Sequence, residues 1–166
     1  MNDQTSRIER LRTELEAAFR NRGDLYRLMY ETLSNELGAD KAEQLLAISI
    51  EERGREVARA AFSSFGPDDA RAIGEAFLKV SPDDGQMYPA NVTRFDEGIE
   101  FKVRRCPLKD AWVEAGLDEE RVSTLCRIAS AFDRGLFEQT GIRFENWTWK
   151  PGDGPGCCRI RLTNQT

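Results

Sequence analysis

The spacing of apolar residues along the chain changes near residue 90, from a helical period to the alternation of a strand. Before that point apolar side chains recur every three or four residues, which predicts helices over residues 5–22, 25–37, 40–64 and 67–80. Gly23 and Gly38 are expected to end the first two helices. Asp40 with Glu43 resembles a capping box at the start of the third.

The second half of the chain predicts two β-hairpins with helices between them. Alternating residues predict strands over 92–95, 99–105, 142–149 and 157–163. Pro107 is expected to start a short helix, and Asp118 to cap a longer one that ends at Gly141. The fold class is therefore α+β, with N-terminal helices packed on a small twisted antiparallel sheet of about four strands.

The length of 166 residues suggests a single domain, 1–166, in which a helical part (1–80) precedes a hairpin–helix–hairpin part (90–163). A net charge of -5 argues against nucleic acid as a partner, because phosphate binding requires a basic surface. No apolar run approaches the roughly 20 residues of a membrane span, and the N-terminus lacks the apolar core of a signal peptide. We therefore expect a cytoplasmic protein with reduced cysteines and no membrane partner.

The absence of histidine narrows the chemistry that this chain can perform. Ser-His-Asp and Cys-His catalysis are excluded, and so is a zinc site with imidazole ligands. A nucleophile would need activation by a cation, a carboxylate or a helix dipole.

Cys106 is the candidate nucleophile that the sequence favours. It follows a predicted strand and precedes Pro107, so its thiol is expected at a helix N-terminus, where the dipole lowers the pKa of a thiol. Arg104 and Arg105 would act in the same direction, so Cys106 should be the most acidic of the four thiols. The alternative is a structural cysteine at the end of a strand.

The other cysteines have plain structural interpretations as well. Cys126 lies on the apolar face of its predicted helix, where a cysteine is more often a small core residue than a ligand. Strand alternation directs Cys158 inward and Cys157 outward, so Cys106, Cys126 and Cys158 are expected to converge. No Cys-x-x-Cys pair occurs, so a metal on the cysteines is the weaker interpretation, and we expect no cofactor.

Arg53 and Gly54 interrupt the apolar face of the helix predicted over residues 40–64. Gly54 costs about 1 kcal/mol relative to alanine in a helix, so it is expected to allow close approach of another backbone. Arg53 either extends to water or points inward to meet an anion. Arg105 is a second candidate for binding an anion, because it would place that anion beside Cys106.

Several short motifs resemble the L-2-amino-thiazoline-4-carboxylic acid hydrolase family. They are Val103-x-Arg105-Cys106-Pro107, Leu125-Cys126, Gly152-Asp153, Cys158-Arg-Ile-Arg-Leu162 and, upstream, Glu52-Arg53-Gly54-Arg55. The order of elements also resembles the broader vinyl-reductase-domain and transport-particle fold. That relation implies helices on one side of a twisted sheet, often as a dimer, and leaves a homodimer as one assembly to test.

The resemblance implies a hydrolase that opens a small cyclic amidine carrying a carboxylate. The implied site residues are Cys106, Cys126, Cys158 and an acid, Asp153 or Asp133, with Arg53 or Arg105 binding the carboxylate of the small-molecule substrate. Two other functions stay open: a non-catalytic module that binds or senses a small molecule, and a redox- or metal-responsive cysteine cluster.

Overall fold

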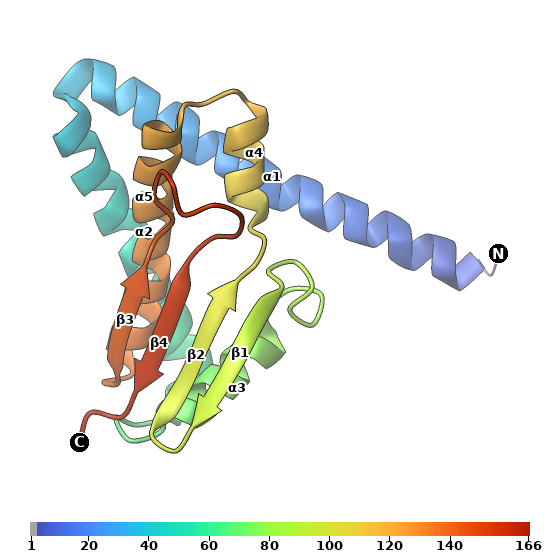
Figure 1. Cartoon of the computed structure of the whole chain (residues 1–166), viewed down its shortest axis with the longest axis vertical. Helices are drawn as coiled ribbons and strands as arrows, with labels where there is room; N and C mark the ends of the chain where they lie inside the picture. The colour runs from blue at the N-terminus through green and yellow to red at the C-terminus, as the bar shows by residue number, and fades with distance from the viewer. Residues whose placement is uncertain (1–2) are drawn as a thin grey trace.

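The computed structural model describes residues 3–166, which form five helices and one four-stranded antiparallel sheet (Figure 1). The helices are α1 (Asp3–Leu37), α2 (Ala39–Ala61), α3 (Ala70–Val80), α4 (Pro107–Glu114) and α5 (Glu119–Gln139). The strands are β1 (Ala90–Phe95), β2 (Gly98–Val103), β3 (Arg143–Trp147) and β4 (Arg159–Thr163). The predicted α+β class is confirmed, and both hairpins and both helices between them form where the pattern indicated.

α1 is one helix where the sequence predicted two. Gly23 does not end it, because this glycine serves packing instead: a Cβ here would lie 3.2 Å from the Cα of Leu108 on α4. The Trp112 indole N–H donates to the Gly23 carbonyl at 2.7 Å, which ties α4 to the middle of α1. The helix ends at Leu37, and Gly38 takes a positive φ of 85° as predicted.

The start of α2 differs from the predicted capping box. Gly38 is the N-cap residue, no side chain caps this end, and Asp40 lies inside the first turn. A carboxylate in the first turn still interacts favourably with the helix dipole, so its position is compatible with a helix start. The expected cap was therefore wrong by two residues, while the helix itself was predicted.

Two glycines let α2 and α5 cross in direct contact. A Cβ on Gly54 would overlap the Phe132 carbonyl of α5, and a Cβ on Gly135 would overlap the Glu51 carbonyl of α2. The close approach expected from Gly54 is confirmed, and its partner on α5 is a second glycine. This crossing fixes α5, which carries Cys126, relative to the rest of the helical layer.

The strand order is β1-β2-β4-β3, and every neighbouring pair is antiparallel. α3 and α5 lie behind the sheet in Figure 1, with α2 behind α5, so the helices cover one face. Apolar side chains of the central strands are buried on that face, whereas Glu100 and Arg159 pair at 2.9 Å on the other. β4 begins at Arg159 and not at the predicted Cys157, which leaves a longer connection between β3 and β4.

The interior has two hydrophobic clusters. One lies between α2, α3, α5 and the sheet, around residues such as Ile73, Ile99 and Phe137. The other lies between α1, α2, α4 and α5 and contains Met87 and the cysteines. Any chemistry of the cysteine thiols therefore takes place within the second cluster.

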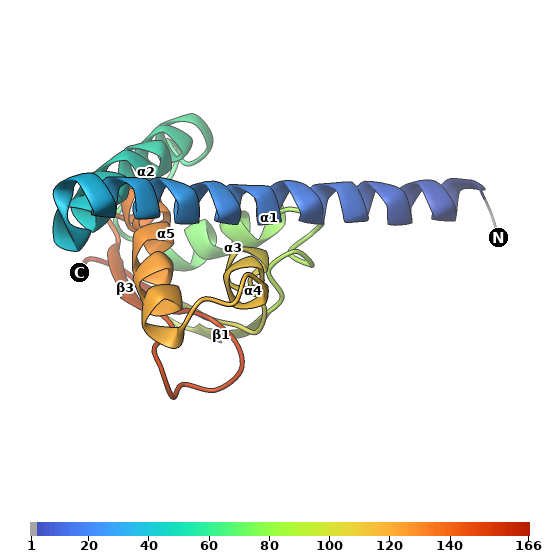
Figure 2. The ribbon, with the colours of Figure 1, turned by 90° about the horizontal axis from the view of Figure 1, so that it is seen from above.

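α1 also presents an apolar face that the rest of the chain leaves open. Figure 2 shows this helix as a straight rod whose N-terminal part extends past the body. About half of the surface of Leu11, Leu25 and Met29 is exposed, at 51%, 50% and 52%. The predicted apolar sides of these helices also include Phe19 and Leu33, which pack on the core, so only part of each predicted side is left open.

Candidate functional site

All four cysteines come together beside the end of β2. Cys106 is the N-cap residue of α4, and Cys126 is buried on α5. Two backbone hydrogen bonds fix the other pair: the Cys157 N–H donates to the Val103 carbonyl at 2.9 Å, and the Val103 N–H donates to the Cys158 carbonyl at 2.9 Å. The thiols at the start of α4, on one side of α5 and in the segment before β4 thus lie together in one buried location.

Cys157 is the centre of this thiol cluster. Its sulfur lies 3.5 Å from the sulfur of Cys158, and the thiols of Cys106 and Cys126 lie close enough to it to shift its pKa. The predicted convergence of the other three cysteines is therefore confirmed, but it occurs around the residue that strand alternation had placed outward. That placement was wrong because β4 begins at Arg159, so alternation does not extend back to Cys157.

The four thiols favour a single thiolate on Cys157. Interaction with the thiols of Cys106, Cys126 and Cys158 lowers the pKa of Cys157 well below that of a free thiol. The same interactions, followed by burial, raise the pKa of each of the other three thiols. The cluster can therefore hold one negative sulfur, surrounded by three neutral S–H groups, without a histidine.

Cys106 is not the most acidic thiol, contrary to the sequence prediction. The expected helix effect exists, since the backbone N–H groups of Leu108 and Lys109 lower the pKa of Cys106. The interaction with Cys157 and burial act more strongly and raise the pKa of Cys106. Arg105 does not help, because its guanidinium pairs with Asp110 at 2.8 Å.

Asp133 supplies the carboxyl group of the site. It lies on α5 seven residues after Cys126, two helical turns further along the same face. Burial, and then the charge on Cys157, raise the pKa of Asp133 from 3.8 to about 7. A carboxyl group that titrates near neutrality can donate and accept protons at physiological pH, which is the property required of a general acid or base.

Tyr88 and Lys109 complete the surroundings of the thiols, and neither was singled out from the sequence. Burial raises the pKa of the Tyr88 phenol, so it stays a neutral donor. Lys109 lies on the first turn of α4, three residues after Cys106, and its positive charge offsets part of the increase in the pKa of Cys126. That i, i+3 spacing on a helix was the signal available in the sequence for Lys109.

Asp153, a predicted catalytic acid, shapes the turn before Cys157 instead of joining the thiols. It is exposed, and its carboxylate accepts a hydrogen bond from the backbone N–H of Lys150 at 2.9 Å. In the same turn the Trp149 indole N–H donates to the Gly154 carbonyl at 2.9 Å, and the Lys109 ammonium lies 4.2 Å from the centre of the Trp149 ring. This turn therefore contributes by positioning Cys157.

The two predicted anion-binding arginines have different positions. The inward orientation considered for Arg53 is wrong: its side chain is 66% exposed and pairs with Glu56 at 2.8 Å, one turn along α2. Arg105 directly precedes Cys106 in the chain. Its side chain points away from the thiols and forms ion pairs with Glu16 and Asp110. Arg105 is thus the predicted arginine that the structure places next to the thiol cluster.

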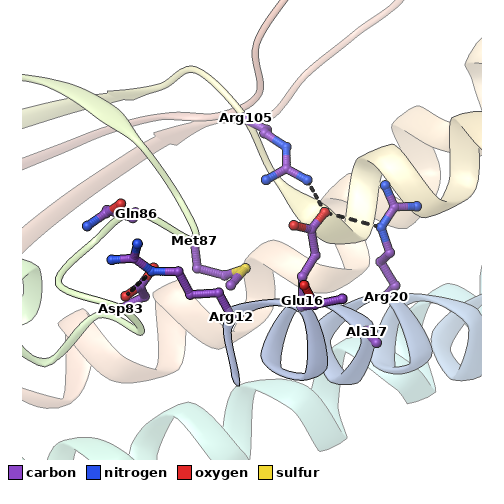
Figure 3. A pocket seen from close by; sticks show the side chains of 9 residues that line it. Arg12, Glu16, Ala17, Arg20, Asp83, Gln86, Met87 and Arg105 are labelled. Atoms are coloured by element: carbon purple, nitrogen blue, oxygen red, sulfur yellow. Dashed lines mark hydrogen bonds and ion pairs between the residues drawn. The ribbon is translucent and has the colours of Figure 1, made fainter. Parts of the chain in front are cut away.

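Arg105 lines a polar groove of about 420 Å³ between the N-terminal half of α1 and the loop of residues 81–89 (Figure 3). Three arginines face this groove together with two acids, Glu16 and Asp83. The other two are Arg12, which pairs with Asp83 at 2.8 Å, and Arg20, which contacts Glu16 at 3.4 Å. Met87 also lines the groove and belongs to the same core cluster as the cysteines.

Comparison with known proteins finds one matching family. The family model for L-2-amino-thiazoline-4-carboxylic acid hydrolase matches residues 18–162, which include all four cysteines and Asp133. The chain belongs to this family. The resemblance predicted from the short motifs is therefore confirmed, and the amino-thiazoline hydrolase family is the frame for the site described above.

The fold of this member of the amino-thiazoline hydrolase family also resembles a solved structure. It is similar to a trafficking protein particle complex subunit 3 from Naegleria fowleri covalently bound to palmitic acid, with a TM-score of 0.51, 17% sequence identity, and coverage of 86% of this chain and 96% of that one. This likeness confirms the predicted transport-particle fold. None of the curated proteins matches the chain.

Two further observations bear on other expectations. Across residues 3–166, none of the helices combines the length and apolar character needed to cross a bilayer. In that same part of the chain, no three Cys, Asp or Glu side chains are grouped as ligands for a metal ion. All four cysteines of the thiol cluster are free, with no disulfide between them.

Proposed function

We propose that this protein hydrolyses a small cyclic amidine that carries a carboxylate, of the amino-thiazoline carboxylate type, by thiol chemistry at Cys157. The family match supports this class of substrate. The observation that carries the proposal is the gathering of three thiols around Cys157, which lowers the pKa of that residue. A buried thiolate is an activated nucleophile without a histidine base.

The reaction balances with the groups present. The Cys157 thiolate adds to the ring carbon bonded to nitrogen and sulfur, and one bond from that carbon to a ring heteroatom breaks. The leaving heteroatom takes the proton of Asp133, whose pKa of about 7 leaves it partly protonated at neutral pH. The resulting Asp133 carboxylate then accepts a proton from the water that attacks the adduct and releases the thiolate.

The neighbouring thiols and Tyr88 support this step without reacting. The S–H groups of Cys106, Cys126 and Cys158 stabilise the thiolate when it leaves the adduct. The neutral phenol of Tyr88, whose pKa is raised by burial, is a hydrogen-bond donor on the Cys106 and Asp133 side of the site. Cys106, Cys126 and Cys158 are therefore proposed as positioning and stabilising residues around Cys157.

The test is turnover of 2-amino-thiazoline-4-carboxylate by wild-type protein and by Cys157→Ser. Ring opening by the wild type and a loss of at least 100-fold in Cys157→Ser are expected, because a serine hydroxyl is not ionised in this setting. Cys106→Ser should retain more activity than Cys157→Ser. If the wild type binds the compound with no turnover, the non-catalytic binding module becomes the better description.

A homodimer through α1 is the assembly we propose for this protein. The open face of α1 carries Leu11, Leu25 and Met29, each about half exposed. Antiparallel pairing with a second copy would cover these residues and would bring the basic Arg7 and Arg10 near Glu36 of the other copy. Light scattering should give twice the chain mass for the wild type and the monomer mass for Leu25→Glu; equal masses would contradict this assembly.

A further inference from the structure

The polar groove and the thiol cluster lie on the two sides of one layer of chain. Arg105 lines the groove while its neighbour Cys106 contacts Cys157. Met87 lines the groove while its neighbour Tyr88 interacts with Cys106. Since both segments alternate in this way, a single thickness of backbone separates an open, solvent-facing groove from the buried thiols.

That wall is made of two segments joined to each other. The Arg104 N–H donates to the Pro89 carbonyl at 2.7 Å, which connects the end of the 81–89 loop to the segment before Cys106. Met87 is 4% exposed and forms the floor of the groove. A methionine is unbranched and flexible, so it can change rotamer more easily than a β-branched residue can.

The charges in the groove suit a zwitterion. Arg20 and Arg105 both contact the carboxylate of Glu16 (Figure 3), while Arg20 also pairs with Glu114 and Arg105 also pairs with Asp110. An incoming carboxylate can take the place of Glu16 and accept hydrogen bonds from guanidinium groups that the other two acids hold in position. At the other end, Asp83 presents a carboxylate to a cationic group such as an amidinium. A small ring with an amidinium at one end and a carboxylate at the other matches both ends.

The 81–89 loop has an unusual backbone conformation at its tip. Asp83 and Asp84 have φ values of 54° and 51°, and Gly85 follows with 82°, so two consecutive non-glycine residues adopt the left-handed region. Non-glycine residues stay in this region where the surroundings hold them. The ion pair between Arg12 and Asp83 at 2.8 Å joins this tip to α1, and the edge contact between Tyr88 and Phe19 joins the other end of the loop to the same helix.

We propose that this groove is the binding site for a zwitterionic amidino carboxylate, and that movement of the 81–89 loop with Met87 opens the path by which the ring reaches the thiols. The chemical class of the ligand rests on the proposed function. Arg20 and Arg105 bind the carboxylate, and Asp83 exchanges its pairing with Arg12 for the amidinium of the ligand. Breaking that pairing frees the Asp83 end of the loop from α1, so binding and opening are coupled.

Two neighbouring alanines on α1 provide a matched test. Ala17 lines the groove and Ala18 does not, and both are exposed, so a tryptophan at either position is compatible with the fold. Calorimetric titration with 2-amino-thiazoline-4-carboxylate is done in the Cys157→Ser background, which prevents consumption of the compound. We expect Ala17→Trp to weaken binding at least tenfold and Ala18→Trp to change it less than twofold. Equal affinities in the two variants, or no binding to the parent protein, would overturn the proposal.

The ligand and the loop are tested separately. 2-Amino-thiazoline without the carboxylate should bind at least tenfold more weakly than the carboxylate compound, and Asp83→Asn should increase the rate of iodoacetamide alkylation of the thiols severalfold. An unchanged alkylation rate would overturn the role of the loop. If wild type and Ala17→Trp hydrolyse the compound with the same KM, the groove is not the binding site, while the proposed hydrolase function still stands. If Ala17→Trp weakens binding but wild type does not hydrolyse the compound, the groove is supported and the hydrolase function is refuted.

Discussion

The carboxyl group of Asp133 and the sulfur of Cys157 share one buried environment, in which a negative charge on Cys157 raises the pKa of Asp133. Burial is the larger cause of that increase, and together the two bring the pKa to about 7. At neutral pH the site therefore favours a thiolate with a protonated acid beside it. This is the combination that nucleophilic addition followed by proton donation requires.

Asp133→Asn should lower activity and raise stability at alkaline pH. The pKa of this acid is 3.8 in the unfolded chain and about 7 in the fold, so its contribution to stability is full below about pH 4 and is lost as the pH rises through 7. Chemical denaturation at pH 5 and pH 8 should show the variant gaining about 1–3 kcal/mol relative to wild type at the higher pH. The turnover of the wild type should decline as the pH rises above 7.

Asp153→Asn is the control for that experiment, since its carboxylate accepts a hydrogen bond in an exposed turn. We expect its activity to stay within about threefold of wild type, with the same dependence of stability on pH. An Asp133→Asn variant that kept wild-type turnover, or lost stability at pH 8, would show that this carboxyl group does not carry the proton.

The thiols should differ in how their alkylation depends on pH. Cys157 should keep its reactivity with iodoacetamide as the pH falls from 8 to 6, because its pKa is lowered, whereas labelling of Cys106 and Cys126 should fall about tenfold per pH unit. Peptide mapping of partly labelled wild-type protein measures all four at once. A steeper decline at Cys157 than at Cys106 would place the thiolate elsewhere.

Gly54→Ala should be strongly destabilising. Its Cβ would overlap the Phe132 carbonyl of α5, so the two helices must move apart. We expect a loss of about 2–4 kcal/mol in the free energy of unfolding, in the range of other overpacked sites. Gly66→Ala is the control, because the nearest atom to its Cβ is the Asp69 carboxylate at 3.7 Å, and it should change stability by less than about 0.5 kcal/mol. Similar losses in the two variants would contradict the close helix crossing.

Arg53→Ala should have little effect on either activity or stability. The side chain is 66% exposed and its one ion pair, with Glu56, is of the kind that contributes about 0.3–0.5 kcal/mol on a helix surface. Arg105→Gln should instead raise the KM for a carboxylate substrate at least tenfold. Steady-state kinetics on the two variants decides between the arginines, and a larger KM effect at Arg53 would restore the role first considered for it.

The sequence predicted the elements well where local chemistry determines them. Gly38, Asp118 and Pro107 mark helix ends in the structure as they did in the pattern. Gly23 was misread because a glycine that ends a helix and one that admits another helix look alike in sequence. The two kinds of glycine are distinguished here by the contact of Gly23 with Trp112, which lies 89 residues away in the chain.

The sequence predicted which cysteines lie together, but it did not predict that Cys157 lies between the other three. Cys106, Cys126 and Cys158 converge as expected, since a helix face and a strand end can be read locally. The acidity of Cys157 depends on which sulfur lies between the others, and that is set by the register of residues 157 and 158 against Val103. No local pattern encodes this register, so the sequence assigned the lowest thiol pKa to Cys106.

The central claim is that Cys157 attacks the ring carbon of a cyclic amidino carboxylate, and trapping the adduct tests it most directly. Wild-type protein is mixed with 2-amino-thiazoline-4-carboxylate, quenched in acid over a series of times from milliseconds to seconds, and measured by intact-mass and peptide mass spectrometry. A transient increase equal to the mass of the compound should be located on Cys157 and should be absent from Cys157→Ser protein. An adduct on Cys106, Cys126 or Cys158, or turnover by Cys157→Ser at the wild-type rate, would contradict the claim.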